Sequence, residues 1–257
     1  GARTRARAHR TTLSEAELSY LKPASGYPGI MAVAPTTLSI NYQIQTRAAG
    51  GDFADRGTGD WTPSGILVAE VGPLDTVLHV NMTRFPSVGD GLLLNDEVIR
   101  VDAVDEFAGT LNVGRGCFDT LPAGHDESDV IWLWRDALES DGIEYLAGET
   151  VEARLLTRTS TETLAASAAP VSSLVIAQRQ SRPYLPGNIR VNGSPYPSLV
   201  IAATDYTLTF AHRDRLLQAD CLIDCTEGSI GPEPGVELVA TLINQVTAEE
   251  VWSVTSG

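Results

Sequence analysis

The sequence predicts a mainly β protein made of antiparallel strands, arranged as two β domains in succession. Short segments rich in Val, Ile and Leu recur along most of the chain, and several of them alternate apolar with polar residues. Turn-forming residues such as Asp-Gly and Ala-Gly separate these segments. A length of 257 residues allows one large domain or two small ones, and a hydrophobic content of 43% is enough to form a buried core.

The first 26 residues form a region of their own. Four arginines lie within residues 1–10, which we expect to be a flexible basic arm or a connection from an upstream domain. Such an arm would also suit nucleic acid or an acidic neighbouring subunit. Ser14 and Glu17 have the spacing of a capping box and Pro23 would end a helix, so a short helix is expected here.

Residues 27–183 are expected to form the first domain, a β-sandwich or barrel. Its expected strands cover residues 39–46, 65–71, 75–82, 92–104, 110–115, 130–134, 149–159 and 174–178. Within 97–104, Ile99 and Val101 fall on an apolar face, and Arg100 falls on a mixed face, as in a half-buried strand. The stretch 48–65 holds five glycines and three aspartates, so we expect a loop there.

Residues 184–257 are expected to form the second β domain. Its expected strands cover residues 188–193, 198–204, 206–214, 220–224, 236–243 and 249–255. This spacing predicts a β-sandwich of the fibronectin type III or immunoglobulin type. Because such a sandwich usually needs about 100 residues, we expect its last one or two strands to be missing and the chain to be a portion of a longer protein.

The charge balance excludes several functions. The 33 acidic and 18 basic residues give a net charge of −15, which repels nucleic acid and anionic lipid. The sequence has no apolar run of about 20 residues that would span a bilayer, and we expect no secretory signal at its N-terminus. We therefore expect no nucleic-acid partner and no membrane insertion. Free cysteines without an export signal fit the cytoplasm.

Known cofactor and catalytic motifs are absent from the sequence. It contains no GxGxxG, phosphate loop, GxSxG or HExxH pattern, so we expect no cofactor and no catalytic residue. Its three cysteines are too few for a disulfide framework and lack further ligands at zinc spacing. Asp52, Asp55 and Asp60 do not follow the spacing of an EF-hand, so no metal is expected either.

The segment 114–134, GRGCFDTLPAGHDESDVIWLW, is the richest in side chains that enzymes use. Cys117 and His125 would act as nucleophile and base only if a turn brought them together. A tight loop is the preferred interpretation, in which Asp119 satisfies backbone amides and Arg115 anchors the turn. We therefore expect Arg115, Asp119 and His125 to be structural.

The same segment carries a resemblance. RGCFDTLPAGH followed by WLW resembles a stretch common in large tail proteins of long-tailed bacteriophages and prophages. GETVEARLLTRT, RPYLPGNIRVNG and FAHRDRLLQADCLIDCTEGSIGPEPGVELVATL continue the pattern in the same order, over roughly residues 65–245. The resemblance implies a baseplate-hub or host-recognition component of the tail tip, with a fibronectin type III-like module opening at RPYLPGNIRVNG. It implies no catalytic residues, and only structural roles for the Arg115–His125 loop and the His212–Asp214 turn.

The expected function is a non-enzymatic structural component of a phage tail tip, located in the virion and assembled in the bacterial cytoplasm. Expected partners are other tail-tip subunits, further copies of the chain in a homo-oligomer, and a bacterial surface receptor or glycan. The candidate contact regions are residues 48–60, the loop around Asp126 and residues 228–235. Phe53 and Trp61 are the expected contact residues, because aromatic anchors dominate many interfaces. Packing of Trp61 onto the first domain is an equal alternative.

Two other functional classes stay open. A carbohydrate-active tail enzyme that degrades host polysaccharide or peptidoglycan would need a pair of carboxylates across a groove, or a zinc site. A non-catalytic carbohydrate-binding module would need aromatic stacking platforms, for which an aromatic content of 6% is thin.

Overall fold

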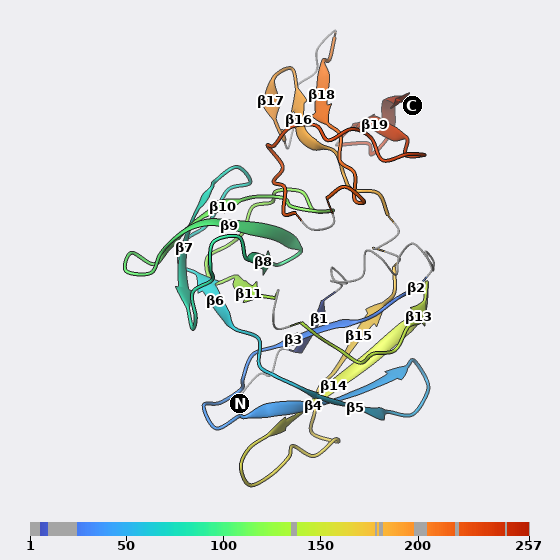
Figure 1. Ribbon diagram of the computed structural model, residues 1–257. Coiled ribbons are helices and arrows are strands. Elements are labelled where there is room, and N and C mark those ends of the chain that lie inside the picture. The colour runs from blue at the N-terminus through green and yellow to red at the C-terminus, as the bar shows by residue number, and fades with distance from the viewer. Residues whose placement is uncertain are drawn as a thin grey trace.

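The computed structural model describes residues 6–9, 25–134, 138–177, 179, 182–197, 205–218, 221–244 and 246–256. These residues form twenty β-strands and no α-helix, and every paired strand is antiparallel to its neighbour. Figure 1 shows a barrel, a second sheet beside it and a C-terminal region beyond the barrel. In this part of the chain no helix is long and apolar enough to cross a membrane.

A closed six-stranded barrel forms the centre of the molecule (Figure 1). Its strands are β6 (Ser64–Leu67), β7 (Val77–Met82), β8 (Gly91–Leu94), β9 (Glu97–Asp105), β10 (Thr110–Gly114) and β11 (Val130–Leu133), in the order β10-β7-β6-β11-β8-β9. Leucine, isoleucine and valine side chains from all six strands fill the interior, including the fully buried Ile99 and Val101. Because successive strand residues point to opposite faces, Val98 packs instead into a second cluster with Trp132 and Cys117.

The second sheet has the order β15-β14-β4-β5. It contains β4 (Asn41–Ala48), β5 (Ala54–Gly59), β14 (Thr150–Arg158) and β15 (Val171–Val175). Alternate residues of β4, Tyr42, Ile44 and Thr46, are buried. The short strands β1 (Ala6–His9), β3 (Gly29–Ala32) and β12 (Glu139–Ser140) form a three-stranded sheet, and β2 (Ser25–Gly26) pairs with β13 (Tyr145–Leu146). A core of Ile30 with Tyr42 and Ile44 joins β3 to β4.

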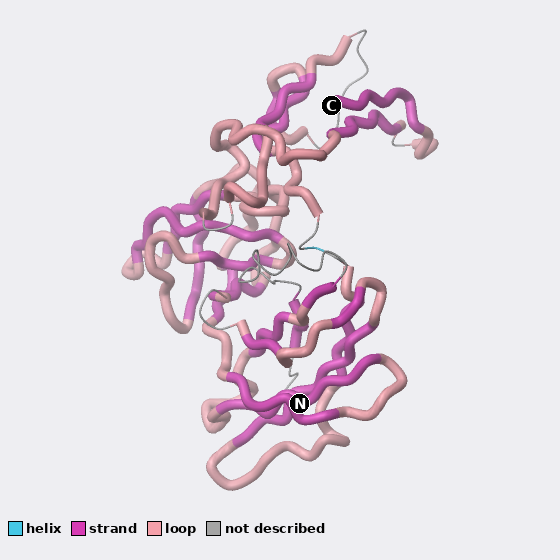
Figure 2. The backbone as a smooth tube through the Cα atoms, turned by 45° about the vertical axis from the view of Figure 1, so that its right-hand side comes forward, coloured by secondary structure: helices cyan, strands magenta, loops and turns pink. Residues whose placement is uncertain are grey.

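The C-terminal region contains two small sheets. Strands β16 (Gly187–Val191), β17 (Ser194–Pro195) and β18 (Leu208–Ala211) form one, and β19 (Leu238–Ile243) with β20 (Glu250–Ser256) forms a hairpin. Figure 2 shows both sheets beyond the barrel, on the side away from the second sheet. Arg100 of β9 reaches this region, because its guanidinium donates to the Leu222 carbonyl and pairs with Asp224 and Glu227.

The prediction of a mainly β, antiparallel protein with a barrel is confirmed, but several local predictions are wrong. Residues 54–59, expected in a loop, form β5, because this segment pairs with β4 across a bulge. Residues 92–104 form two strands rather than one. The turn between them is possible because Asn95 adopts a φ of 52°, a left-handed conformation that asparagine tolerates.

Corrections also concern the two ends of the chain. Residues 6–9, expected in a flexible arm, form β1 and pair with β3, and β2 begins before residue 27. Residues 221–224 are not a strand, and the Leu222 carbonyl and the Asp224 carboxylate bond to Arg100 instead. The expected helix after Ser14 and the expected strand 198–204 lie outside the described residues. The three cysteines are free.

Candidate functional site

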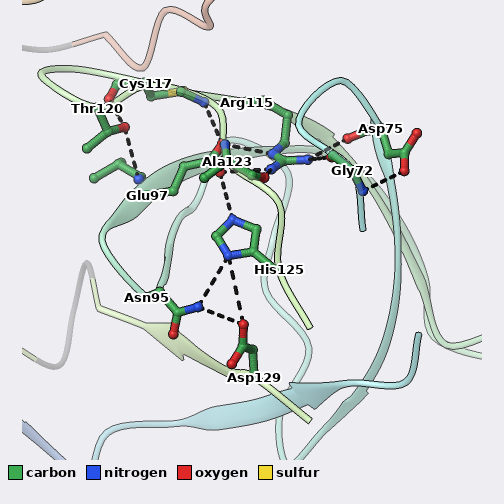
Figure 3. A network of polar contacts seen from close by, with 12 residues as sticks. Gly72, Asp75, Asn95, Glu97, Arg115, Cys117, Thr120, Ala123, His125 and Asp129 are labelled. Atoms are coloured by element: carbon green, nitrogen blue, oxygen red, sulfur yellow. Dashed lines mark hydrogen bonds and ion pairs between the residues drawn. The ribbon is translucent and has the colours of Figure 1, made fainter. Parts of the chain in front are cut away.

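The loop that follows β10 is anchored by one buried guanidinium (Figure 3). Nε and Nη2 of Arg115 donate to the two carboxylate oxygens of Glu97, each at 2.8 Å. Nη1 donates to the carbonyls of Gly72 and Asp75, and Nη2 also donates to the carbonyl of Ala123. A guanidinium has five N–H groups, and all five of these have an acceptor. One side chain thereby joins the start of β9, the loop after β10 and the β6–β7 connection.

Glu97 is equally saturated. Its carboxylate accepts the two bonds from Arg115, the backbone amides of Gly116 and Ala123, and the Nε2–H of His125 at 2.8 Å. Burial is the largest effect on this carboxyl and would raise its pKa. The hydrogen bonds from His125 and Arg115, the charge of Arg115 and the Ala123 amide together outweigh burial, so the pKa of Glu97 lies below its ordinary value of 4.5. The buried group is therefore a carboxylate.

His125 links this cluster to the β8–β9 turn. Because its Nε2 donates to the carboxylate, its Nδ1 is the acceptor for Nδ2 of Asn95 at 3.3 Å. The same Asn95 amide donates to Asp129 at 2.6 Å. The backbone of His125 also exchanges two hydrogen bonds with Val71 in the β6–β7 connection. Both ring nitrogens and the backbone of this histidine therefore hold loops together.

This arrangement does not assemble a nucleophile. The thiol of Cys117 is fully buried and donates to the carbonyl of Gly114, while His125 is bonded to Glu97 and Asn95. Burial raises the pKa of the Cys117 thiol far above its ordinary range, which disfavours the reactive thiolate. In this geometry Arg115 and His125 are both engaged in hydrogen bonds that hold the loops of the barrel end, and their structural role stays a prediction.

Asp119 has a different partner from the one expected. Its carboxylate binds the guanidinium of Arg179 through two hydrogen bonds, one of them 2.6 Å long, rather than capping the loop's own amides. Next to it, Phe118 packs its ring edge against Tyr184, with centroids 5.9 Å apart. Asp119 thus ties the loop to the segment that leads into the C-terminal region.

A groove of about 1300 Å³ lies beside the cluster. Its walls come from the β8–β9 turn, the loop after β10, strand β15 and the segment before β16. Asp96 and Asp119 both line it, and two exposed leucines, Leu121 (41%) and Leu185 (45%), provide apolar surface. Across the described residues, no three His, Cys, Asp or Glu side chains are arranged to hold a metal ion.

The two expected contact residues have partners within the chain. Phe53 lies under the guanidinium groups of Arg47 and Arg154, 4.3 and 4.0 Å from its centroid. Trp61 is half-buried, with its ring 4.8 Å from that of Tyr42 at an interplanar angle of 59°. The contact with Tyr42 is of the kind expected under the alternative in which Trp61 packs onto the first domain. Binding of a partner by either residue stays a prediction.

Glu97 and Asn95 are the site residues that sequence reasoning missed. A usable signal was present, because Glu97 alternates with Ile99 and Val101 and therefore falls on the apolar face of this strand. Such a position is buried, so its charge requires a partner.

The chain matches no protein-family model and no curated protein.

Replacing Glu97 should destabilise the barrel strongly. Glu97→Gln leaves the Arg115 charge buried without its counter-ion, which costs about 3–5 kcal/mol. Chemical denaturation followed by tryptophan fluorescence measures the loss. Glu127→Gln removes an exposed carboxylate from the loop after β10 and is the matched control, expected to be neutral. Equal stability of the two variants would contradict the central role of Glu97.

The stability contributed by Glu97 should depend on pH. Its folded pKa is lowered, so its contribution is complete above the unfolded pKa of about 4.3 and is lost as the pH falls through the folded value. The difference in unfolding free energy between wild type and Glu97→Gln should therefore be constant from neutral pH to about pH 4.5 and shrink below it. A difference that already disappears near pH 6 would contradict this assignment.

Trp61→Ala should lower the melting temperature. The variant removes the ring contact with Tyr42 and the bond from Nε1 to the Ser39 carbonyl, a loss of about 1–3 kcal/mol for a half-buried aromatic. Leu38→Ala, at a side chain that is 75% exposed in the β3–β4 connection next to Ser39, is the control. Unchanged melting together with lost binding to host cells would instead favour direct contact by Trp61.

Proposed function

We propose that this chain is a non-enzymatic structural component of the tail tip of a long-tailed bacteriophage, located in the virion and assembled in the bacterial cytoplasm. Its β modules would hold loops in place for tail assembly and for attachment to a bacterial surface receptor or glycan. The observation that carries this proposal is the saturated cluster of Arg115, Glu97 and His125. The segment that resembles tail proteins uses its polar side chains to fix a barrel end.

Fixed connections between modules support the proposal. The Arg115 carbonyl accepts a hydrogen bond of 2.7 Å from the Cys225 amide, which attaches the barrel to the C-terminal region. Within that region, the buried Arg213 donates to the carbonyls of Asp224, Glu227 and Gly228. Arg100 of β9 adds a guanidinium contact from the barrel to the same region. Modules held together in this way suit a role that requires a constant shape.

We further propose that residues 184–257 form a fibronectin type III-like module. The hairpin β19–β20 has one apolar face, made of Leu238, Ala240, Leu242, Trp252 and Val254. Trp252 is 50% exposed and Val254 is 45% exposed. In a β-sandwich such a face is covered by a second sheet, and the segment RPYLPGNIRVNG contains strand β16 of the other small sheet in this region.

A carbohydrate-active enzyme is the alternative that one observation favours. Asp96 and Asp119 line the same groove, and glycoside hydrolysis uses two carboxyl groups. The ion pair between Asp119 and Arg179 weighs against it, because a guanidinium stabilises the charged carboxylate and opposes a role as general acid.

Labelling of phage particles tests the proposed location. Gold-conjugated antibodies raised against this chain should bind the tail tip of particles released by the bacterium that encodes it. Particles from a deletion mutant are the control and should bind no antibody. Label on the capsid, or none on intact tails, would contradict the location. Release of reducing sugars or muropeptides from host cell walls, absent from a heat-denatured sample, would contradict the non-enzymatic role.

A further inference from the structure

The groove beside the Glu97 cluster follows the edge of strand β15. Three consecutive residues of this strand, Ser172, Ser173 and Leu174, line it. Because successive strand residues point to opposite faces of a sheet, three in a row share one groove when the groove runs along the strand's edge. Strand β15 is the outermost strand of its sheet and, within the described part of the chain, pairs only with β14. Its outer backbone N–H and C=O groups therefore face the groove.

The other walls of the groove add side chains with hydrogen-bonding groups to spare. Asp96, Ser173 and Arg182 are exposed, and none of these three side chains bonds another residue that the structure describes. Asn95 donates its amide N–H groups to two neighbours, so its carbonyl oxygen, which points away from them in Figure 3, is a further acceptor. The groove thus offers a ligand both hydrogen-bond donors and hydrogen-bond acceptors.

The charges along the groove cancel. The carboxylate of Glu97 is saturated by its own donors, and that of Asp119 is paired with the guanidinium of Arg179. Among the described lining residues, the charged side chains left unpaired are the carboxylate of Asp96 and the guanidinium of Arg182. This balance gives no net attraction to a polyanion or to a cationic peptide. The groove therefore favours a neutral ligand.

Apolar surface lies beside these polar groups. Leu121, Pro183 and Leu185 are exposed in the groove walls. A sugar ring carries hydroxyl groups around its rim and C–H groups on its faces, so it fits fixed donors and acceptors next to small apolar patches. Each hydroxyl both donates and accepts, as this lining requires. The groove volume of about 1300 Å³ exceeds the roughly 300–1,000 Å³ of sites for single small ligands, which suits several sugar units.

We propose that this groove binds a neutral oligosaccharide of the bacterial surface. Sugar hydroxyls bond Asp96, Arg182 and the backbone edge of β15, and the ring faces lie against Leu121 and Leu185. The inference rests on the proposed function, because it names the site and the ligand class by which the chain attaches to its host. The described lining contains no aromatic side chain, so one groove binds weakly and several copies in one particle supply avidity.

Titration of the purified chain with envelope polysaccharide from the bacterium that encodes it tests the site. Saturation-transfer NMR detects weak binding and should show transfer to the sugar ring protons. Arg182→Ala and Asp96→Asn should each weaken binding about tenfold or more, as expected when a hydrogen bond to a charged group is lost. Arg84→Ala and Glu106→Gln, at exposed residues outside the groove, are the matched controls and should bind like wild type. Equal binding by all four variants would overturn the site.

Treatment of the envelope extract separates the ligand classes. Periodate, which cleaves vicinal diols, should abolish binding, whereas protease treatment should leave it intact. Binding should change little between low and high ionic strength, because the ligand is neutral. Protease-sensitive binding would overturn the saccharide in favour of an extended peptide paired with β15, and a steep loss with salt would overturn its neutrality. An absence of saccharide binding would overturn the inference, and gold label at the tail tip would in that case leave the proposed function standing.

Discussion

The buried charge of Arg115 is the constraint on which the barrel end depends. A guanidinium cannot lose its proton in a protein and must find acceptors for five N–H groups wherever it is buried. Two of these acceptors come from Glu97 and three from backbone carbonyls on two different connections. The loop after β10 and the β6–β7 connection therefore take the shapes that bring those carbonyls to one point. The glycine at position 116 has a φ of 56°, and a side chain there would lie 2.8 Å from Pro122, so this backbone path also requires glycine.

Guanidinium groups also bond carboxylates and backbone carbonyls in and next to the C-terminal region. Of the 18 basic residues only Lys22 is a lysine, and the described arginines act largely by bonding carboxylates and carbonyls. Arg100 joins β9 to the C-terminal region, and Arg213 holds the turn within it. A lysine at either position would offer a point charge without the planar fork that reaches several acceptors at once. These guanidinium groups are therefore the means by which the chain fixes its irregular loops.

Sequence patterns predicted the regular part of this fold and missed the irregular part for identifiable reasons. Alternation located β4, β7, β14 and β19, because one buried face leaves a period of two. It failed at β5, where an edge strand containing glycine and aspartate is held by pairing with β4 rather than by burial. At the site, local turn chemistry predicted that Arg115 and His125 lie in a loop. It did not predict the partner of Asp119, because Arg179 lies 60 residues away and long-range ion pairs leave no local pattern.

A buried ion pair is weak evidence of added stability, since well-packed apolar residues can replace one without loss. What the cluster around Glu97 supplies is a defined geometry, because five donors fit one carboxylate in a single arrangement of three chain segments. Ala123 and His125 belong to that cluster and also line the groove. The bonds that fix the barrel end therefore also fix one wall of the groove. The position of that wall and the path of the segment 114–125 both follow from one set of hydrogen bonds.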